Sequence, residues 1–215
     1  MLGFEPGSTH ILFGQSGSGK TNFIKRILQN KEHLFGEQPP SIIKYYYGIW
    51  QNTYDQIQEI IENISFQQGL PTEDELLAFT DPEKHSLIIV DDLMDEAANS
   101  SVMELLFTRI SHHRNCTCFY ILQNAFIQGK KQVTINLNTK YMEVFRSPRS
   151  LLQLSYLNSQ IFPHIPGLLI QAYNDIMKNE QYGYLIIDLT AQCPDELRLR
   201  TKIFPMEDTI IYKKD

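Results

Sequence analysis

Gly14-Gln15-Ser16-Gly17-Ser18-Gly19-Lys20-Thr21 is the stretch of sequence that decides the fold. Its spacing satisfies the pattern G-x-x-x-x-G-K-[S/T], in which a glycine-rich loop wraps the phosphates of a nucleotide. Residues 9–13, Thr-His-Ile-Leu-Phe, predict a short buried strand before the loop, and apolar residues after the loop recur at helical spacing. These recurring residues are Phe23, Ile24, Ile27 and Leu28. The sequence therefore predicts a strand, a phosphate-binding loop and a helix, in that order.

The residue types of the loop indicate which ligands it takes. The backbone N–H groups of residues 14–21 and the positive end of the following helix dipole would bind the phosphates of ATP. Lys20 would reach the outer phosphates, and the Thr21 hydroxyl would be a ligand of Mg²⁺. We therefore expect ATP and Mg²⁺ to bind together at this loop.

A second apolar run, residues 87–90, leads directly into Asp91 and Asp92. Such a continuous run is typical of a buried parallel strand, and ligands of open α/β sheets bind beyond the carboxyl ends of the strands. Asp91 is therefore a candidate Mg²⁺ ligand, directly or through water. Asp92 is a candidate to orient or deprotonate the attacking water. The alternative is an ordinary strand end that is followed by an acidic turn.

Residues 116–122 predict another strand, which ends at Gln123. A polar side chain there can contact the γ-phosphate or the lytic water, and we assign this sensor role to Gln123. The alternative is a polar residue that only caps the strand. A zinc site is a further hypothesis for the neighbouring residues His112, His113, Cys116 and Cys118. It is disfavoured because the cysteines are not at C-x-x-C spacing, and cysteines that alternate along a strand are ordinary core residues.

Hydrophobic periodicity and turn residues indicate the remaining elements. Two helices are predicted to open with capping boxes, Thr53 with Gln56 and Thr72 with Glu75. The first of them carries an apolar stripe of Ile57, Ile60, Ile61 and Ile64. Further helices are predicted over residues 100–113, 150–159 and 167–179, and further strands over 41–48, 140–145, 182–189 and 199–204. The last two strands are expected to extend the sheet in antiparallel fashion.

Composition limits the class of protein. With 215 residues and 42% hydrophobic content, the chain suits one globular α/β domain. The net charge of −6 hides an asymmetry, because residues 105–150 hold seven Lys and Arg against one Glu. This segment indicates a face or pore edge that meets phosphate, or else loops that balance the acidic half. Three cysteines, no visible signal peptide and no apolar span indicate a soluble, intracellular protein without a membrane partner.

Three features in a fixed order along the chain resemble those of a known family. They are the phosphate loop, the strand that ends in Asp91-Asp92-Leu93-Met94, and the strand that ends in Gln123. The chain resembles the additional-strand P-loop ATPases of the FtsK/HerA superfamily over roughly residues 9–205. It is most similar to the compact genome-packaging ATPases of poxvirus-like large DNA viruses, Polinton/Maverick elements, adintoviruses and virophages.

The resemblance implies a fold, a single ATPase domain over residues 1–215, and an assembly. The fold would be an α/β P-loop NTPase of the additional-strand (ASCE, RecA-like) type, with a mostly parallel central sheet, helices on both faces and a C-terminal antiparallel extension. The assembly would be a homo-oligomeric ring, often a hexamer, that threads double-stranded DNA. A capsid or portal component is a further expected partner. The expected location is the host cytoplasm or nucleus, or the virion.

The resemblance also transfers roles to single residues. Lys20 and Thr21 carry over as phosphate and Mg²⁺ contacts, Asp91 as the Mg²⁺ carboxylate and Gln123 as the sensor. Many members have Glu where this chain has Asp92, which leaves the identity of the base open. The arginine that such rings insert into a neighbour's site has no match near Lys140, so Arg149 and Arg146 are the expected substitutes, with Arg114 behind them.

The function predicted from these features is an ATP-driven motor that hydrolyses ATP to move double-stranded DNA. DNA contact would be mainly to phosphates, with Lys130 and Lys131 as candidate contacts. One alternative is a P-loop small-molecule or nucleoside kinase, although no dense arginine-rich lid is visible. Another is a nucleotide-gated assembly protein without productive turnover. A GTPase is disfavoured because no N-K-x-D motif is present.

Overall fold

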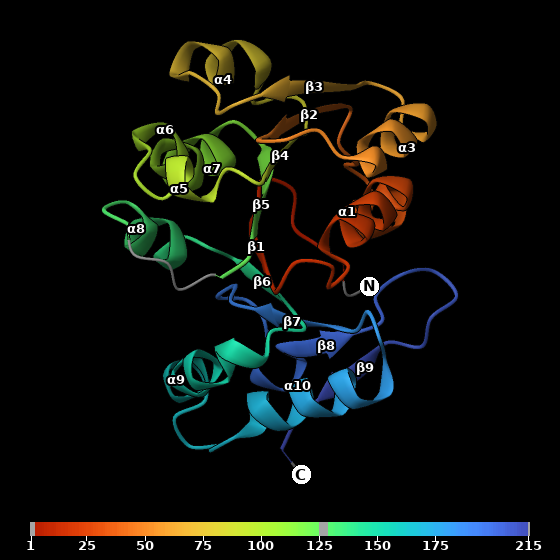
Figure 1. Ribbon diagram of the computed structural model, residues 1–215, viewed down its shortest axis with the longest axis vertical. Helices are drawn as coiled ribbons and strands as arrows, with labels where there is room; N and C mark the ends of the chain where they lie inside the picture. The colour runs from red at the N-terminus through yellow and green to blue at the C-terminus, as the bar shows by residue number, and fades with distance from the viewer. Residues whose placement is uncertain (1–2, 125–128, 215) are drawn as a thin grey trace.

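A nine-stranded sheet is the centre of the structure, a computed structural model that describes residues 3–124 and 129–214 (Figure 1). The strands lie in the order β3-β2-β4-β5-β1-β6-β7-β8-β9. Their bounds are β1 Thr9–Phe13, β2 Ile42–Tyr47, β3 Ile64–Gln68, β4 Ser86–Asp91, β5 Cys116–Leu122, β6 Tyr141–Phe145, β7 Tyr184–Asp188, β8 Leu199–Thr201 and β9 Ile210–Tyr212. Neighbours from β3 to β6 are parallel, and those from β6 to β9 are antiparallel. The predicted sheet with its antiparallel C-terminal extension is confirmed.

Helices cover both faces of this sheet, as the fold class predicted (Figure 1). One face carries α1 Lys20–Gln29, α2 Lys31–Phe35 and α3 Asn52–Ile60. The other carries α4 Glu73–Phe79, α5 Met94–Ala97, α6 Ser101–Leu105, a π-helical turn Leu106–Ile110, α7 Ser111–His113, α8 Gln132–Leu137, α9 Leu151–Ile161 and α10 Leu168–Asn179. Alternate side chains of one strand serve the two cores: Leu87 packs toward α1 and α3, and Ile88 packs toward the opposite helices.

The position of β5 confirms the additional-strand type. β5 lies between β1, which leads into the phosphate loop, and β4, which ends at Asp91. Phe13 pairs with Leu122, and Asp91 pairs with Ile121, so the three strands end nearly level. The phosphate loop, Gln123 and the acidic pair therefore leave the sheet at one edge.

The start of α3 differs from the prediction. The helix begins at Asn52, and its N-cap residue, Gln51, makes no side-chain capping bond. The capping box predicted for Thr53 and Gln56 is therefore wrong, because both residues lie inside the helix. The second predicted box is confirmed: Thr72 Oγ1 accepts from the backbone N–H of residue 75 at 3.2 Å, and the carboxylate of that glutamate accepts from Thr72 N–H at 2.8 Å.

The end of α3 also differs. The apolar stripe predicted to run through Ile64 stops at Ile60, which is half-exposed, and Ile64 opens the edge strand β3. Asn63, with φ of 58°, turns the chain between the two elements. The strand β3 was missed because its sequence, ISFQQ, has no apolar run and its first isoleucine fits the helical period. The short elements α2 and β9 were also not predicted.

The structure bears on the zinc hypothesis and on the prediction that no segment spans a membrane. Cys116 and Cys118 are fully buried in β5 as core residues, and the described ranges hold no group of three or more His, Cys, Asp or Glu arranged to bind a metal ion. Among the same residues, the helices all lack the combination of length and apolar character that crossing a bilayer requires.

Candidate nucleotide site

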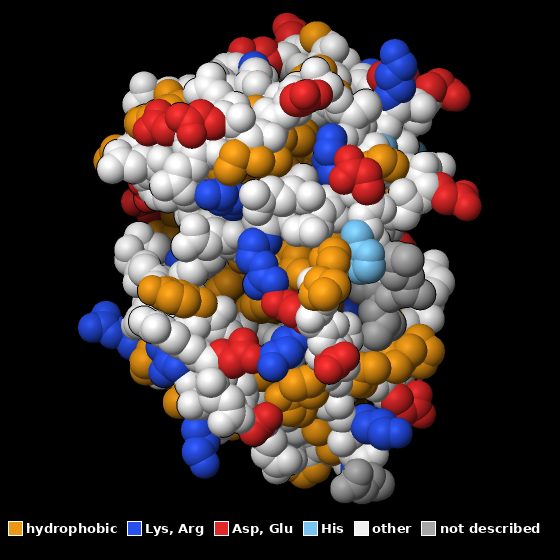
Figure 2. All heavy atoms as spheres, turned by 90° about the vertical axis from the view of Figure 1, so that its right-hand side faces the viewer, with side chains coloured by type: hydrophobic (Ala, Val, Ile, Leu, Met, Phe, Trp, Pro, Cys, Tyr) orange, Lys and Arg blue, Asp and Glu red, His pale blue; other side chains and the backbone are white. Residues whose placement is uncertain are grey.

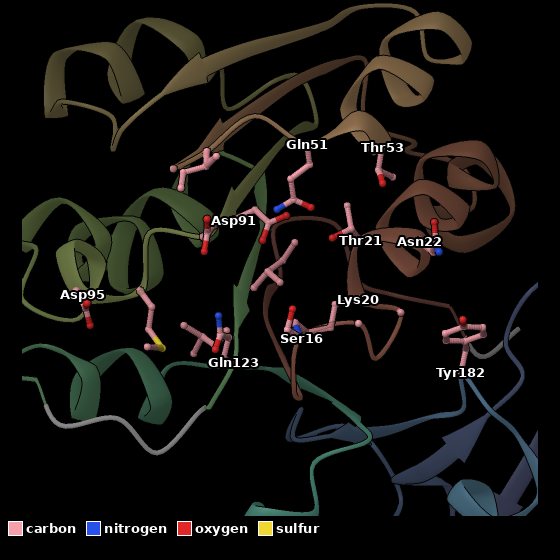
Figure 3. Close-up of a pocket in the computed structure, with 18 of the residues that line it drawn as sticks. Ser16, Lys20, Thr21, Asn22, Gln51, Thr53, Asp91, Asp95, Gln123 and Tyr182 are labelled. Atoms are coloured by element: carbon pink, nitrogen blue, oxygen red, sulfur yellow. The ribbon is translucent and has the colours of Figure 1, made fainter.

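A pocket of about 660 Å³ lies at the carboxyl edge of the parallel strands (Figure 3). The phosphate loop, the first turn of α1, the β2–α3 connection and the ends of β4 and β5 form its walls. Among its lining residues are Ser16, Gly17, Gly19, Lys20, Thr21, Asp91, Asp92 and Gln123. The structure thus brings the loop, both candidate Mg²⁺ ligands, the candidate base and the candidate sensor to one cavity. Gly14, Gln15 and Ser18 belong to the loop without lining the cavity.

The loop backbone needs glycine at three of its positions. Gly17 and Gly19 have φ values of 76° and 102°, a region that strains residues with a Cβ. A Cβ on Gly14 would lie 2.6 Å from Phe145 Cβ, because the loop passes closely over the end of β6. The glycines of the motif therefore follow from the path of this backbone.

Lys20 lies at the centre of the loop. Its ammonium donates to the carbonyl oxygens of Gly14 at 2.6 Å and of Gln15 at 3.0 Å. Burial lowers the pKa of Lys20, and the nearby carboxylate of Asp91 acts in the opposite direction. The ammonium is thus held inside the curve of the loop, where a phosphate group bound by the backbone amides would meet it.

The surroundings of the loop suit an anion. No side chain caps the N-terminus of α1, and its first turn contains no acidic residue, so the N–H groups of this turn can bind phosphate. Ser18 Oγ is buried and has no hydrogen-bond partner among the described residues. A buried hydroxyl of this kind costs free energy unless a ligand or water completes its bonding. The loop therefore fits the phosphates of a nucleotide.

Asp91 is the buried acid of the site. Its Oδ2 atom accepts hydrogen bonds from Tyr45 Oη at 2.8 Å and from Tyr54 Oη at 2.9 Å. Burial raises the pKa of Asp91, while the two phenol hydrogen bonds and the charge of Lys20 lower it. In Figure 3, Asp91 and Thr21 approach the same space from β4 and from α1.

Asp92 and Gln123 are exposed to the pocket rather than buried. Asp92 has φ of 57°, which turns the chain sharply away from β4 directly after the buried acid. The backbone of Gly48 packs against this turn, since a Cβ there would lie 2.1 Å from the carbonyl oxygen of Asp92. Gln123 follows β5 and so lies between the loop and the acidic pair. Both side chains can therefore reach a ligand in the cavity.

The oxygen donors of the pocket fit Mg²⁺. This ion is bound by hard oxygen ligands, usually one or two carboxylates together with substrate phosphates and water. The Thr21 hydroxyl and the carboxylates of Asp91 and Asp92 are such oxygen donors among the residues that line the pocket. The residues present therefore fit a magnesium ion that enters with a nucleotide.

The candidate arginines do not join this site. Arg146 donates to the carbonyl oxygen of Met177 and, at 3.4 Å, to that of Glu180, so its side chain binds the C-terminal end of α10. Arg114 Nε donates to Thr80 Oγ1 at 2.7 Å and holds the end of α4. Arg149 is exposed and lies outside the pocket lining. Of the three, Arg149 is the one whose guanidinium makes no hydrogen bond or ion pair within residues 3–124 and 129–214.

The basic segment is partly neutralised within the chain. Lys131 pairs with Glu104 at 2.6 Å, and Lys140 pairs with Glu5 at 3.1 Å. Arg109 and Lys130 are exposed. On the face that α1 and α3 cover, Lys and Arg are interspersed with Asp and Glu (Figure 2). The two paired lysines therefore fit the interpretation of charge balance within the chain. Arg109 and Lys130 stay candidates for contact with phosphate.

Several lining residues escaped the sequence analysis. They are Asn22, Gly48, Ile49, Gln51, Thr53, Met94, Asp95, Glu96, Ile121, Leu122 and Tyr182. Tyr182 is the most distant in sequence from the loop, and its ring lies against Gly19, whose Cβ would be 3.2 Å from Tyr182 Cδ1. No local pattern marks it, because it reaches the loop only through the packing of β7 beside β6. Asp95 and Glu96 could have been suspected from their position soon after the acidic pair.

Comparisons with known proteins bear on the fold. No protein-family model matches the chain, and no curated protein matches its sequence. Among solved structures, B204, the DNA-packaging ATPase from Sulfolobus turreted icosahedral virus, aligns with a TM-score of 0.55 and 14% identity over 99% of this chain and 100% of that one. The genome-packaging NTPase B204 from Sulfolobus turreted icosahedral virus 2, in complex with sulfate, aligns with a TM-score of 0.57 and 14% identity over 99% and 98%. The chain has the fold of these packaging ATPases.

Proposed function

We propose that this chain is an ATP-driven motor that moves double-stranded DNA, of the genome-packaging type, with residues 1–215 as one ATPase domain. The observation that carries the proposal is one pocket lined by Lys20, Thr21, Asp91, Asp92 and Gln123, at the edge where β5 separates β1 from β4. The pocket supports nucleotide hydrolysis in general, and the fold shared with two viral packaging NTPases supports DNA packaging as its purpose.

In this proposal the loop and the start of α1 bind the β- and γ-phosphates, and Lys20 contributes the positive charge. A Mg²⁺ ion held by Thr21 and Asp91 would neutralise charge on the phosphate oxygens. Asp92 orients the attacking water and accepts its proton as the water oxygen bonds to the γ-phosphorus and the bond to the β–γ bridging oxygen breaks. Gln123 contacts the γ-phosphate or this water, so its position differs between ATP and ADP. The state of the nucleotide thereby changes the position of the residue at the end of β5.

The charge balance of the pocket favours an assembly of several copies. Among its described lining residues, Lys20 is the single Lys or Arg beside four carboxylates, those of Asp91, Asp92, Asp95 and Glu96. Phosphoryl transfer needs further positive charge in the transition state, which an arginine from a neighbouring subunit can provide. We propose a homo-oligomeric ring, such as a hexamer, that docks on a capsid or portal component.

Within the ring, Arg149 is the residue that we propose to enter the neighbour's pocket. Its exposure supports this role, whereas the contacts of Arg146 with α10 oppose it. DNA would be held through its phosphates by exposed cations of residues 105–150. Lys130 and Arg109 are stronger candidates than Lys131, which is paired with Glu104.

The steady-state ATPase rate with and without linear duplex DNA tests the proposal. We expect strong stimulation by DNA, and we expect Lys20→Ala to abolish both the basal and the stimulated rate. A multimeric preparation that hydrolyses ATP at a rate indifferent to DNA would refute the motor and direct attention to phosphoryl acceptors. Tight ATP binding without turnover would instead favour a nucleotide-gated assembly protein.

A further inference from the structure

Two buried tyrosines contact the candidate Mg²⁺ ligand, and the proposed chemistry gives them no role. Tyr45 and Tyr54 are both fully buried, and both donate their hydroxyl hydrogen to the same atom, Asp91 Oδ2. Tyr45 lies on β2, which pairs with β4 beside it, whereas Tyr54 lies on α3. The carboxylate of Asp91 is thus fixed from the sheet and from a helix at once.

The two hydrogen bonds determine which oxygen of Asp91 remains available. A carboxylate oxygen accepts through about two lone-pair sites, so the two phenols at 2.8 and 2.9 Å saturate Oδ2. Asp91 also lines the pocket. Oδ1 is therefore the oxygen of this carboxylate that can serve a ligand there.

The tyrosines are held in place by an aromatic cluster, which we define as Tyr45, Tyr47, Trp50, Tyr54 and Phe66. The rings of Tyr45 and Tyr54 lie 4.8 Å apart between centroids, and Phe66 stacks on Tyr45 at 5.0 Å. Trp50 contacts Tyr54 at 5.6 Å. The neighbouring residues Gln51 and Thr53 line the pocket, so the cluster connects its wall to Asp91.

We propose that Tyr45 and Tyr54 are positioning residues of the nucleotide site, which hold Asp91 so that Oδ1 faces the Mg²⁺ ion of a bound nucleotide. The proposal rests on the proposed function, because it needs Mg²⁺ and nucleotide at this pocket. Partners of this kind orient metal ligands, and their loss typically weakens metal affinity or activity about 10–100-fold. A merely structural role, in which the phenols anchor α3 to the sheet, would affect nucleotide binding equally with and without the metal.

The test compares three phenylalanine variants of the full chain. Tyr54→Phe and Tyr45→Phe each remove one hydroxyl and keep the ring. Tyr47→Phe is the matched control, because Tyr47 belongs to the same cluster through Trp50 and Tyr54 but its hydroxyl is not on Asp91. Emission of Trp50, the single tryptophan of the chain, gives the dissociation constant for ATP in Mg²⁺ and in EDTA. Urea unfolding of each variant verifies that it is folded.

We expect Tyr54→Phe and Tyr45→Phe to raise the dissociation constant in Mg²⁺ about 10-fold or more and to leave the value in EDTA unchanged. Tyr47→Phe should change neither value. Equal weakening in both conditions, or no change in either, would overturn the positioning role while the wild-type affinity for Mg²⁺-ATP still supports the proposed function. If one variant does not fold, the other makes the same comparison. A wild-type protein that binds ATP no better with Mg²⁺ than with EDTA would overturn both.

Discussion

The two glycines of the phosphate loop with left-handed backbone offer a matched pair of perturbations. Gly17 and Gly19 lie two residues apart, with φ of 76° and 102°. An added Cβ on Gly17 meets nothing within 4 Å, whereas on Gly19 it meets the ring of Tyr182 at 3.2 Å. Gly17→Ala therefore isolates the backbone strain, and Gly19→Ala adds a side-chain collision to it.

The expected costs follow from these contacts. Left-handed backbone costs a residue with a Cβ about 1–2 kcal/mol, so Gly17→Ala should lower the free energy of unfolding by that amount. In Gly19→Ala the ring of Tyr182 must also shift by a few tenths of an ångström. Tyr182 is 58% exposed, so its ring can move, and an off-rotamer side chain costs about 0.5–1.5 kcal/mol. Gly19→Ala should thus destabilise by about 1.5–3.5 kcal/mol.

Urea unfolding of four proteins makes the comparison: Gly17→Ala, Gly19→Ala, Tyr182→Ala and the double variant Gly19→Ala/Tyr182→Ala. In the double variant the collision is absent, so the coupling free energy should be about 1 kcal/mol in favour of the double variant. Equal losses for the two glycine variants would refute the reasoning. So would additive losses in the double variant, because the ring of Tyr182 would then not lie against the loop.

Three other predictions follow from single contacts. Burial lowers the pKa of His85 below its ordinary value of 6.5, so the unfolded state takes up a proton first and stability falls as the pH drops below about 6.5. His85→Asn should flatten this loss in urea unfolding between pH 7.5 and 5.5, and an equally steep loss would contradict the assignment. Asn158→Ala removes the acceptor of the buried Leu169 N–H and a donor to the part-buried carbonyl of Ile165. The buried N–H alone should cost about 1–3 kcal/mol of stability, and a loss below about 0.5 kcal/mol, the limit for ordinary surface changes, would argue against these bonds. Replacing Lys130 and Arg109 by Ala should weaken the binding of duplex DNA. The slope of log binding constant against log salt concentration should fall in magnitude by about 0.9 for each phosphate that is no longer neutralised. An unchanged slope would show that these two residues do not contact the DNA phosphates.

The parts of the site that were predicted from sequence are those in which a local pattern determines the geometry. The phosphate loop follows β1 directly, so its glycines, Lys20 and Thr21 could be located by spacing alone. Asp91 and Gln123 each end a strong apolar run. Because the carboxyl ends of parallel strands meet at one edge, their convergence required no knowledge of the strand order.

The parts that could not be predicted depend on contacts between distant segments. Tyr182 meets Gly19 only because β7 pairs with β6. The hydrogen bonds of Tyr45 and Tyr54 to Asp91 join three elements. Tyr45 lies in a largely apolar strand sequence and Tyr54 near the start of a helix, and neither position has a local pattern that marks a contact with Asp91.

Buried polar pairs are a second case of the same kind. His10 on β1 contacts Glu143 on β6 at 2.8 Å, with both side chains fully buried. Arg200 on β8 pairs with Asp188 on β7 at 2.9 Å. Charged residues inside a strand weaken the apolar pattern by which strands are recognised, and only the register of the sheet brings the partners together.

The end of α3 was misread for a different reason. Isoleucine at the first position of β3 fits the helical period of the preceding residues, and helix and strand patterns cannot be separated over so few residues. The backbone is already extended at Ile61, and the left-handed backbone at Asn63 then turns the chain into β3. Asparagine tolerates this conformation better than most residues, which is the one local signal that could have marked the boundary.

Displacement of a triplex-forming strand from linear duplex DNA is the measurement that tests the central claim most directly, because a motor that moves along the duplex removes the third strand. We predict that the wild-type chain releases the strand with ATP, that it does not with a non-hydrolysable ATP analogue, and that Lys20→Ala does not release it under either condition. ATP hydrolysis that DNA stimulates without any release of the third strand would contradict the account, since hydrolysis would then not be coupled to movement along DNA.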